Sequence, residues 1–258
     1  MLGTVISNEC LNKNYYIMEI ESEEFVKSAR AGQFFMLKAQ QQDYIVDPLL
    51  RRPFGVCDIN GNKFKFLYTV IGKGTQLLTH IRSKTEIKFS EPLGNTFKLV
   101  ENSNVALVAG GVGIAPLVWL AKELKEKNNE VTIYYGGRTT DDIVMVDELS
   151  EISDNLIITT DDGSVGIKGL VVEPFEKDIE KFNMVYSCGP KKMLKAVSEI
   201  CIKNNVKIEV SMDERMACGI GACLGCIIYI KENDKIVQKR CCVEGPVFDG
   251  KLISWNKD

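Results

Sequence analysis

The feature that most constrains this chain is a group of cysteines near its C-terminus. Five of its nine cysteines lie within 25 residues, and three follow the spacing Cys218-x4-Cys223-x2-Cys226, with Cys241 and Cys242 after them. A C-x4-C-x2-C run with a distant fourth cysteine is typical of plant-type [2Fe–2S] sites. The residues after about 210 are too few for a hydrophobic core of their own, so we expect a metal to organise them.

The chief alternative for these cysteines is structural zinc. Zinc sites commonly use C-x2-C pairs, and only Cys223 and Cys226 have that spacing. Glycines interleave the run, and glycine lets a backbone curl around a cluster and direct N–H groups at its sulfurs. The four-residue gap and the glycines favour iron. Spacing alone leaves open whether Cys241 or Cys242 is the fourth ligand.

Composition excludes several classes of function. Of the 258 residues, 45% are hydrophobic and 26% are charged, as in an ordinary globular protein. A net charge of −3 makes nucleic acid an unexpected partner. A single histidine, His80, excludes most His-dependent catalysis. The clustered thiols and the absence of a signal-peptide pattern at the start indicate a reducing, cytoplasmic compartment.

One stretch has the length of a membrane span. Residues 102–121 carry no charge over 20 residues, but three glycines and Pro116 interrupt them. This pattern favours a buried strand, a glycine turn and a helix. We therefore expect no membrane partner.

The chain changes character twice along its length. Residues 1–98 hold short alternating runs separated by turn signals, which predict an antiparallel β-barrel. Residues 99–210 alternate apolar runs with helical patterns, which predict an open, Rossmann-like α/β domain with a largely parallel sheet. Residues 211–258 form the cysteine-rich segment. The sequence thus predicts three domains with these boundaries.

Candidate nucleotide sites lie in both larger domains. The apolar run 105–109 leads into Gly110, Gly111 and Gly113, with Pro116 in the expected first helical turn. Glycines there let a backbone approach a pyrophosphate, although a plain βα turn is the alternative. The turns at 161–164 and 188–190 are expected at the same sheet edge, where ligands bind. In the barrel, Arg52 stands beside a rigid proline and can clamp a pyrophosphate, unless it is only a solvated charge.

Taken in order, these motifs resemble the ferredoxin–NADP reductase-like superfamily, which pairs an FAD-binding barrel with an NAD(P)-binding α/β domain. The motifs are Arg-Pro-Phe-Gly, Gly-x-Gly-Thr, GGVGIAPL and Cys-Gly-Pro. The cysteine run at 213–226, with residues 242–248, is similar to the electron-transfer subunits of class B dihydroorotate dehydrogenases. The resemblance extends over essentially the whole chain.

The resemblance implies roles at the matching positions. It makes residues 1–98 the FAD-binding barrel, 99–210 the NAD-binding domain and 211–258 the [2Fe–2S] domain. Cys188 would lie near the nicotinamide. The fourth cluster ligand would be Cys242, which the family places two residues ahead of Gly-Pro. The implied FAD contacts are Arg52, Pro53, Phe54, Gly55, Leu67, Tyr68, Thr69, Gly74 and Thr75, and the implied NAD contacts are Gly110, Gly111, Gly113, Pro116, Asp162, Gly189 and Pro190.

The resemblance also implies a function. Electrons would pass from a partner FMN subunit through the [2Fe–2S] cluster and FAD to NAD⁺, in a heterotetramer of two catalytic and two electron-transfer subunits that serves pyrimidine biosynthesis. The family often has Arg-Pro-Ile-Ser where this chain ends the motif with Gly55, and often arginine where this chain has Thr69. Two alternatives stay open: an NAD(P)H reductase that serves a ferredoxin or a sulfur-compound reductase, and a zinc-stabilised nucleotide sensor without enzymatic activity.

Overall fold

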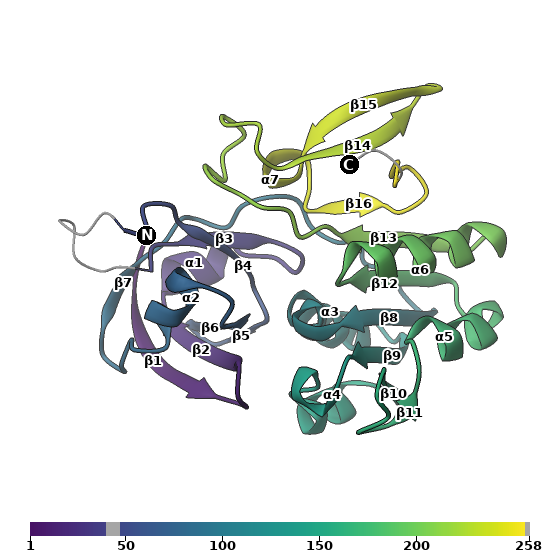
Figure 1. The fold of residues 1–258 in the computed structure, drawn as a ribbon, viewed down its shortest axis with the longest axis horizontal. Coiled ribbons are helices and arrows are strands. Elements are labelled where there is room, and N and C mark those ends of the chain that lie inside the picture. Colours follow the sequence, from purple (N-terminus) through teal and green to yellow (C-terminus); the bar gives the residue numbers. More distant parts are fainter. Residues whose placement is uncertain (40–46, 256–258) are drawn as a thin grey trace.

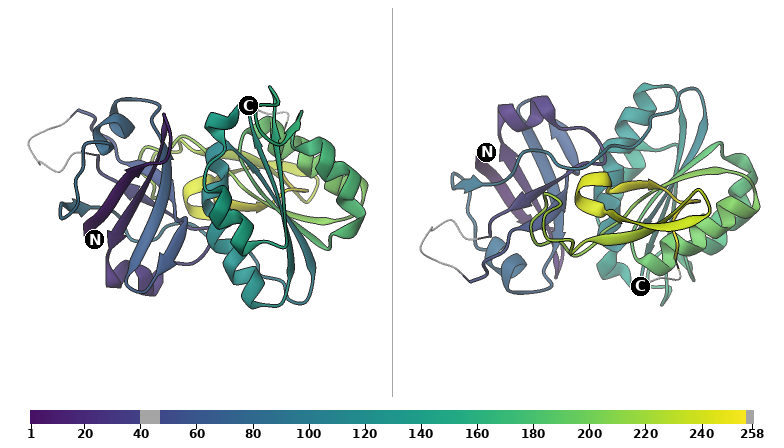
Figure 2. Two further views of the ribbon diagram at one scale, coloured as in Figure 1. Left: turned by 90° about the horizontal axis from the view of Figure 1, so that it is seen from below. Right: turned by 90° about the horizontal axis from the view of Figure 1, so that it is seen from above.

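The computed structural model describes residues 1–39 and 47–255. An antiparallel N-terminal part stands beside an α/β part, and the cysteine-rich C-terminal segment lies across the junction between them (Figures 1 and 2). This is the barrel-plus-α/β architecture that the sequence predicts, and the fold prediction is confirmed.

The N-terminal part is built on a five-stranded antiparallel sheet in the order β5-β6-β2-β1-β7. The pair β3-β4 folds across it, and β3 bridges to residues near and after β7 at Phe89 and Leu93. Buried phenylalanines, among them Phe25, Phe35 and Phe64, fill the space inside. The elements are β1 (Leu2–Cys10), β2 (Tyr15–Glu21), α1 (Glu23–Ser28), β3 (Phe34–Leu37), β4 (Arg52–Gly55), β5 (Asp58–Asn60), β6 (Lys63–Thr69), α2 (Lys73–Leu78) and β7 (Glu86–Lys88).

The α/β part has a seven-stranded sheet in the order β11-β10-β9-β8-β12-β13-β16. All neighbours pair in parallel except β13 and β16. Because the chain winds outward from β8 on both sides, the strand order reverses between β8 and β12, which is where open α/β sheets bind ligands. The elements are β8 (Asn104–Gly110), η1 (Gly111–Ile114), α3 (Ala115–Glu126), β9 (Glu130–Gly137), η2 (Thr140–Asp142), α4 (Val146–Ile152), β10 (Asn155–Thr160), β11 (Ile167–Lys168), α5 (Val172–Asp178), η3 (Ile179–Lys181), β12 (Met184–Cys188), α6 (Lys191–Lys203) and β13 (Lys207–Ser211).

The C-terminal segment is tied into both other parts. Its elements are β14 (Ile227–Glu232), β15 (Lys235–Arg240), α7 (Cys241–Glu244) and β16 (Val247–Asp249). β16 pairs with β13 and becomes the edge strand of the large sheet. Asn95, before β8, donates to the Val247 carbonyl at 2.8 Å and accepts from its N–H at 2.9 Å. The sheet therefore does not end with the predicted boundary at residue 210.

The uncharged stretch at 102–121 folds as predicted. It supplies β8, the glycine turn η1 and the first half of α3, and β8 and α3 are buried almost throughout. No helix in the described part of the chain combines the length and the apolar character that a membrane crossing needs.

Lys122, on α3, joins the two larger parts. Its Nζ lies 2.8 Å from Asp58 Oδ2 in the barrel and 2.8 Å from Glu148 Oε1 on α4. The Asp58 side chain is only 9% exposed, so removing Lys122 would leave a nearly buried carboxylate without its cation. Uncompensated buried charge is strongly destabilising.

We predict that Lys122→Met lowers the free energy of unfolding by about 1–3 kcal/mol, measured by urea denaturation of the full chain. The matched control is Lys125→Met on the same helix. Lys125 pairs with Asp154 at the surface, where both side chains are more than one-third exposed, so its loss should cost less than about 1 kcal/mol. Equal effects of the two variants would contradict a linking role for Lys122.

Candidate active site: a cleft with a cysteine loop at its rim

A cleft of about 1560 Å³ lies between the barrel and the carboxyl ends of the parallel strands. Residues 215–217 and Gly225 of the cysteine-rich segment also line it, so all three parts of the chain meet there. The cleft collects almost every nucleotide-site residue expected from the sequence. These are Arg52, Pro53, Phe54, Gly55, Leu67, Tyr68, Thr69, Gly74, Thr75, Gly110, Gly111, Gly113, Pro116, Cys188, Gly189 and Pro190.

On the barrel side, Arg52 lies against the turn that opens α2. A Cβ added at Gly74 would stand 2.3 Å from Arg52 Nε, so glycine is what lets the guanidinium lie across this turn. Thr75 Oγ1 accepts hydrogen bonds from the N–H groups of Ile71 and Gly72 at 3.0 and 3.2 Å. The turn thereby holds its shape beside a positive charge, which suits a pyrophosphate. At Gly55 a Cβ would meet only Pro116, at 3.7 Å, so the space for the family's serine is present.

On the α/β side, the glycine turn after β8 packs against the turn after β12. A Cβ at Gly113 would lie 2.3 Å from the Cys188 carbonyl oxygen, and one at Gly110 would lie 2.7 Å from Pro190 Cδ. Gly111 has a φ of +53°, which favours glycine. These glycines therefore permit the close approach of two backbone turns at the switch point of the sheet.

Cys188 lies at this switch point and is 6% exposed. Burial, with the neighbouring Asp213 charge, raises the pKa of its thiol to about 12. The thiol is thus neutral at physiological pH and is not a nucleophile. Its expected position near a nicotinamide stays a prediction. In the structure, Cys188 contributes a small, uncharged side chain to the lining of the cleft.

Asp162 is the expected site residue that the structure sets apart. It is not among the residues that line the cleft. Its Oδ1 instead accepts hydrogen bonds from the Ser164 N–H and hydroxyl at 2.9 and 2.7 Å, which hold the turn after β10. Its neighbour Asp161 lines the cleft, together with Arg138 after β9. Of these two neighbours, Asp161 therefore lines the cleft, and Asp162 shapes the turn.

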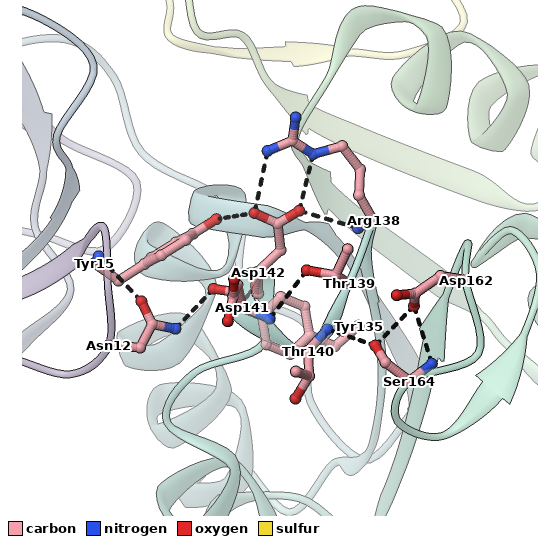
Figure 3. A network of polar contacts seen from close by, with 10 residues as sticks. All are labelled: Asn12, Tyr15, Tyr135, Arg138, Thr139, Thr140, Asp141, Asp142, Asp162 and Ser164. Carbon is pink, nitrogen blue, oxygen red and sulfur yellow. Dashed lines mark hydrogen bonds and ion pairs between the residues drawn. The ribbon is translucent and has the colours of Figure 1, made fainter.

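The cleft residues that escaped the sequence analysis include Tyr15, Asp142 and Asp213. Tyr15 opens β2 in the barrel and donates to Asp142 Oδ1 at 3.3 Å, across the junction (Figure 3). Asp213 follows the end of β13, and burial, with the charge of Glu214, raises its pKa. The sequence signal for Asp213 is its position after a buried strand at the ligand-binding edge.

The loop 218–226 directs backbone N–H groups at cysteine sulfurs. Ile220 and Cys223 donate to Cys218 Sγ at 3.5 and 3.4 Å, and Gly225 donates to Cys223 Sγ at 3.4 Å. The hydrogen bonds from Ile220 and Cys223 lower the pKa of Cys218 to about 6. A thiolate is thus favoured at neutral pH, as metal binding requires.

The four expected ligands lie as two pairs. The Cys218 and Cys223 side chains contact each other, as do those of Cys226 and Cys242. Cys242 N–H also donates to Cys226 Sγ at 3.4 Å. Within residues 1–39 and 47–255, no three His, Cys, Asp or Glu groups close around a single ion. Two pairs fit two irons with two thiolates each better than they fit one tetrahedral zinc.

The geometry also separates the two adjacent cysteines. Cys241 is completely buried and its Sγ donates to the Met212 carbonyl at 3.2 Å. Burial raises the pKa of this thiol well above its usual range. Cys242 instead faces Cys226. The structure therefore supports Cys242 as the fourth ligand, and the assignment stays a prediction.

A β-barrel joined to a parallel sheet at a shared cleft, with a cysteine loop at the rim, defines a flavin- and nicotinamide-linked reductase with an iron–sulfur extension. Solved structures share this fold. A ferredoxin-NADP⁺ reductase from Plasmodium falciparum superposes with a TM-score of 0.63 over 81% of this chain and 95% of its own, at 18% identity. An NADH-dependent reduced ferredoxin-NADP oxidoreductase, solved for insight into flavin-based electron bifurcation, superposes with a TM-score of 0.86 at 34% identity, covering 99% of this chain and 91% of its own.

Sequence comparisons identify the family. Residues 213–254 match the iron-sulfur cluster binding domain of dihydroorotate dehydrogenase B, and residues 107–199 match the oxidoreductase NAD-binding domain. The electron transfer subunit of dihydroorotate dehydrogenase B (NAD(+)) from Clostridium acetobutylicum is 40% identical over 98% of this chain and 96% of its own. The subunit from Caldanaerobacter subterraneus is 38% identical over 96% of each chain. The chain belongs to this family of electron transfer subunits.

The two adjacent cysteines allow a direct test of the cluster. We predict that Cys242→Ala lowers bound iron and acid-labile sulfide by more than half and removes the cluster's visible absorption. Cys241→Ala should keep both, at a stability cost of about 1–2 kcal/mol for the small cavity. Iron and sulfide analysis with an absorption spectrum measures the result. Loss of the cluster only in the Cys241 variant would reverse the assignment.

Proposed function

We propose that this chain is the electron-transfer subunit of an NAD-linked dihydroorotate dehydrogenase, the role that its family's name describes. Electrons from dihydroorotate oxidation on a partner FMN subunit reach the [2Fe–2S] cluster, then FAD, then NAD⁺. The observation that carries the proposal is the shared cleft: the flavin turns, the nicotinamide turns and the cysteine loop line one continuous space. The cysteine loop therefore reaches the cleft of both nucleotide sites through Gly225, and residues 215–217 just before it line the same space.

The chemistry requires these three groups together. NADH carries a hydride and a [2Fe–2S] cluster carries single electrons, and a bound flavin exchanges both. The residues of this chain supply binding and orientation. Arg52 and the Gly74 turn would hold the FAD pyrophosphate, the glycine turns at 110–113 and 189 would hold NAD, and the N–H groups around Cys218 would tune the cluster. No residue need act as a nucleophile.

We place the partner on the exposed side of the cysteine loop. Cys226 and Cys242 are 3% and 2% exposed, whereas Cys223 is on the surface. Exposed apolar side chains lie near the outer pair, Cys218 and Cys223. Ile220 and Leu224 of the same loop are 69% and 62% exposed, and Val243 on α7, next to Gly221, is 46% exposed. Exposed apolar side chains grouped at one loop are typical of a protein interface. The partner proposed to dock here is the FMN-containing catalytic subunit, in a heterotetramer of two subunits of each kind.

All nine cysteines lie in the described part of the chain, and none of them forms a disulfide there. Cysteines in this number without disulfides suit a reducing compartment. We therefore propose that the protein works in the cytoplasm.

The first experiment is an absorption spectrum of anaerobically purified protein before and after NADH. We expect flavin bands together with broad iron–sulfur absorption, and bleaching of both. Co-purification with an FMN subunit, and dihydroorotate-dependent NAD⁺ reduction by the complex, would support the specific role. A coloured protein that reduces ferredoxin and binds no FMN subunit would favour the reductase alternative. A colourless protein after reconstitution with FAD, iron and sulfide would contradict an electron-transfer function.

The docking surface has its own test. We predict that Leu224→Glu weakens binding to the FMN subunit at least tenfold, because a charge at a buried apolar contact must be desolvated. The control is Ile167→Glu on β11, an exposed apolar residue at the far edge of the sheet (54% exposed). Isothermal titration of each variant, with an unchanged cluster spectrum, measures the effect. Equal affinities would place the partner elsewhere.

A further inference from the structure

Arg138 occupies a position that discriminates between dinucleotides. It follows the end of β9, the neighbour of β8 with its glycine turn, and it lines the cleft. In dinucleotide-binding sheets, an acidic residue near this edge binds the ribose hydroxyls of NAD, and an arginine accommodates the 2′-phosphate of NADP. By residue type alone, Arg138 would favour NADP.

Its contacts change that expectation. Arg138 Nε lies 3.0 Å from Asp142 Oδ2, and its second terminal nitrogen lies 3.4 Å from Asp142 Oδ1 (Figure 3). The guanidinium therefore forms a two-point contact with one carboxylate, which is the strongest geometry for such a pair. The Arg138 side chain is 83% exposed, so a ligand in the cleft can reach it. That ligand would meet a guanidinium whose charge is already paired with a carboxylate.

Asp142 is held in place by further donors. Its side chain is only 13% exposed, and the Arg138 backbone N–H donates to Oδ2 at 3.0 Å. The Tyr15 hydroxyl donates to Oδ1 at 3.3 Å from the barrel. Burial opposes ionisation of this carboxyl, but the hydrogen bonds and charge of Arg138 outweigh it and lower the pKa. The carboxylate is thus ionised and fixed before any nucleotide binds.

A second carboxylate adds to the effect. Asp161 also lines the cleft, and its charge acts on Arg138. A 2′-phosphate in this corner would face two carboxylates and one guanidinium. These three groups together carry one net negative charge, which would disfavour a phosphate dianion, while a ribose hydroxyl could donate to a carboxylate.

We propose that Asp142 determines the dinucleotide specificity of this protein by clamping and neutralising Arg138, so that the site accepts NAD and rejects NADP. The proposal rests on the NAD-linked function proposed above. It assigns the discrimination to an ion pair beside the nucleotide site, with Asp142 as the positioning residue and Arg138 as the group it restrains.

The test measures dissociation constants of the FAD- and cluster-loaded full chain for NADP⁺ and NAD⁺, by isothermal titration. Asp142→Asn keeps the shape of the side chain and removes its charge. We expect the ratio of the two constants, NADP⁺ over NAD⁺, to fall at least fivefold. This fall means that NADP⁺ binds more tightly relative to NAD⁺. The double variant D142N/R138L should lose that gain in NADP⁺ affinity, because the freed arginine supplies it. Asp142→Glu should keep the wild-type ratio.

The matched control is Asp141→Asn, which removes the same charge from the neighbouring residue. Asp141 lies outside the cleft lining, and its backbone carbonyl, not its side chain, accepts from Asn12. The ratio of NADP⁺ to NAD⁺ dissociation constants in this variant should stay within twofold of the wild-type ratio. An unchanged ratio in D142N, an equal fall in D141N, or a gain that persists in D142N/R138L would each overturn the proposal.

Salt dependence of the unmodified protein gives a second readout, which needs no variant to fold. Net repulsion of the 2′-phosphate is screened by salt, so the NADP⁺ to NAD⁺ ratio should fall as ionic strength rises. A rising ratio would mean that Arg138 attracts the phosphate, and the proposal would be wrong. Failure to bind either nucleotide would contradict the proposed function itself, so the two failures are distinguishable.

Discussion

The arrangement of this molecule depends on the contact between two backbone turns at the centre of its large sheet. The turn after β8 and the turn after β12 approach so closely that no side chain fits at Gly113, where a Cβ would lie 2.3 Å from a carbonyl oxygen. This contact fixes the point where the strand order reverses, and the cleft opens above it. The barrel supplies the opposite wall, and the cysteine loop closes the rim.

The parts of this fold that depend on a few neighbouring residues could be predicted from the sequence. The run from β8 through α3 follows from a buried strand, glycines and Pro116, because each acts within a few residues. The cysteine run likewise indicated a [2Fe–2S] site, through its spacing and its interleaved glycines. The hairpin β14-β15 was missed, although Asn233 and Asp234 both have positive φ, the conformation of a tight hairpin turn. Asn and Asp favour that turn, so the signal was present in the sequence.

The rest could not be predicted because it depends on residues that meet only in three dimensions. Tyr15 and Asp142 are 127 residues apart and join across the junction. Whether Asp161 or Asp162 lines the cleft depends on the turn after β10, in which Ser164 binds the Asp162 side chain and Asp161 faces the cleft. Cys241 and Cys242 are adjacent in sequence, and only the direction of each side chain separates a buried thiol bonded to a carbonyl from one that faces Cys226. In each case the residue type was informative and the geometry decided its role.

The pairing of β16 with β13 ties two roles to one piece of chain. An uncovered edge strand is a template for pairing with other chains, and β16 covers the edge that β13 would otherwise present. The same C-terminal segment carries the cysteines. Its removal would therefore take away the cluster ligands and also leave the large sheet with an open edge.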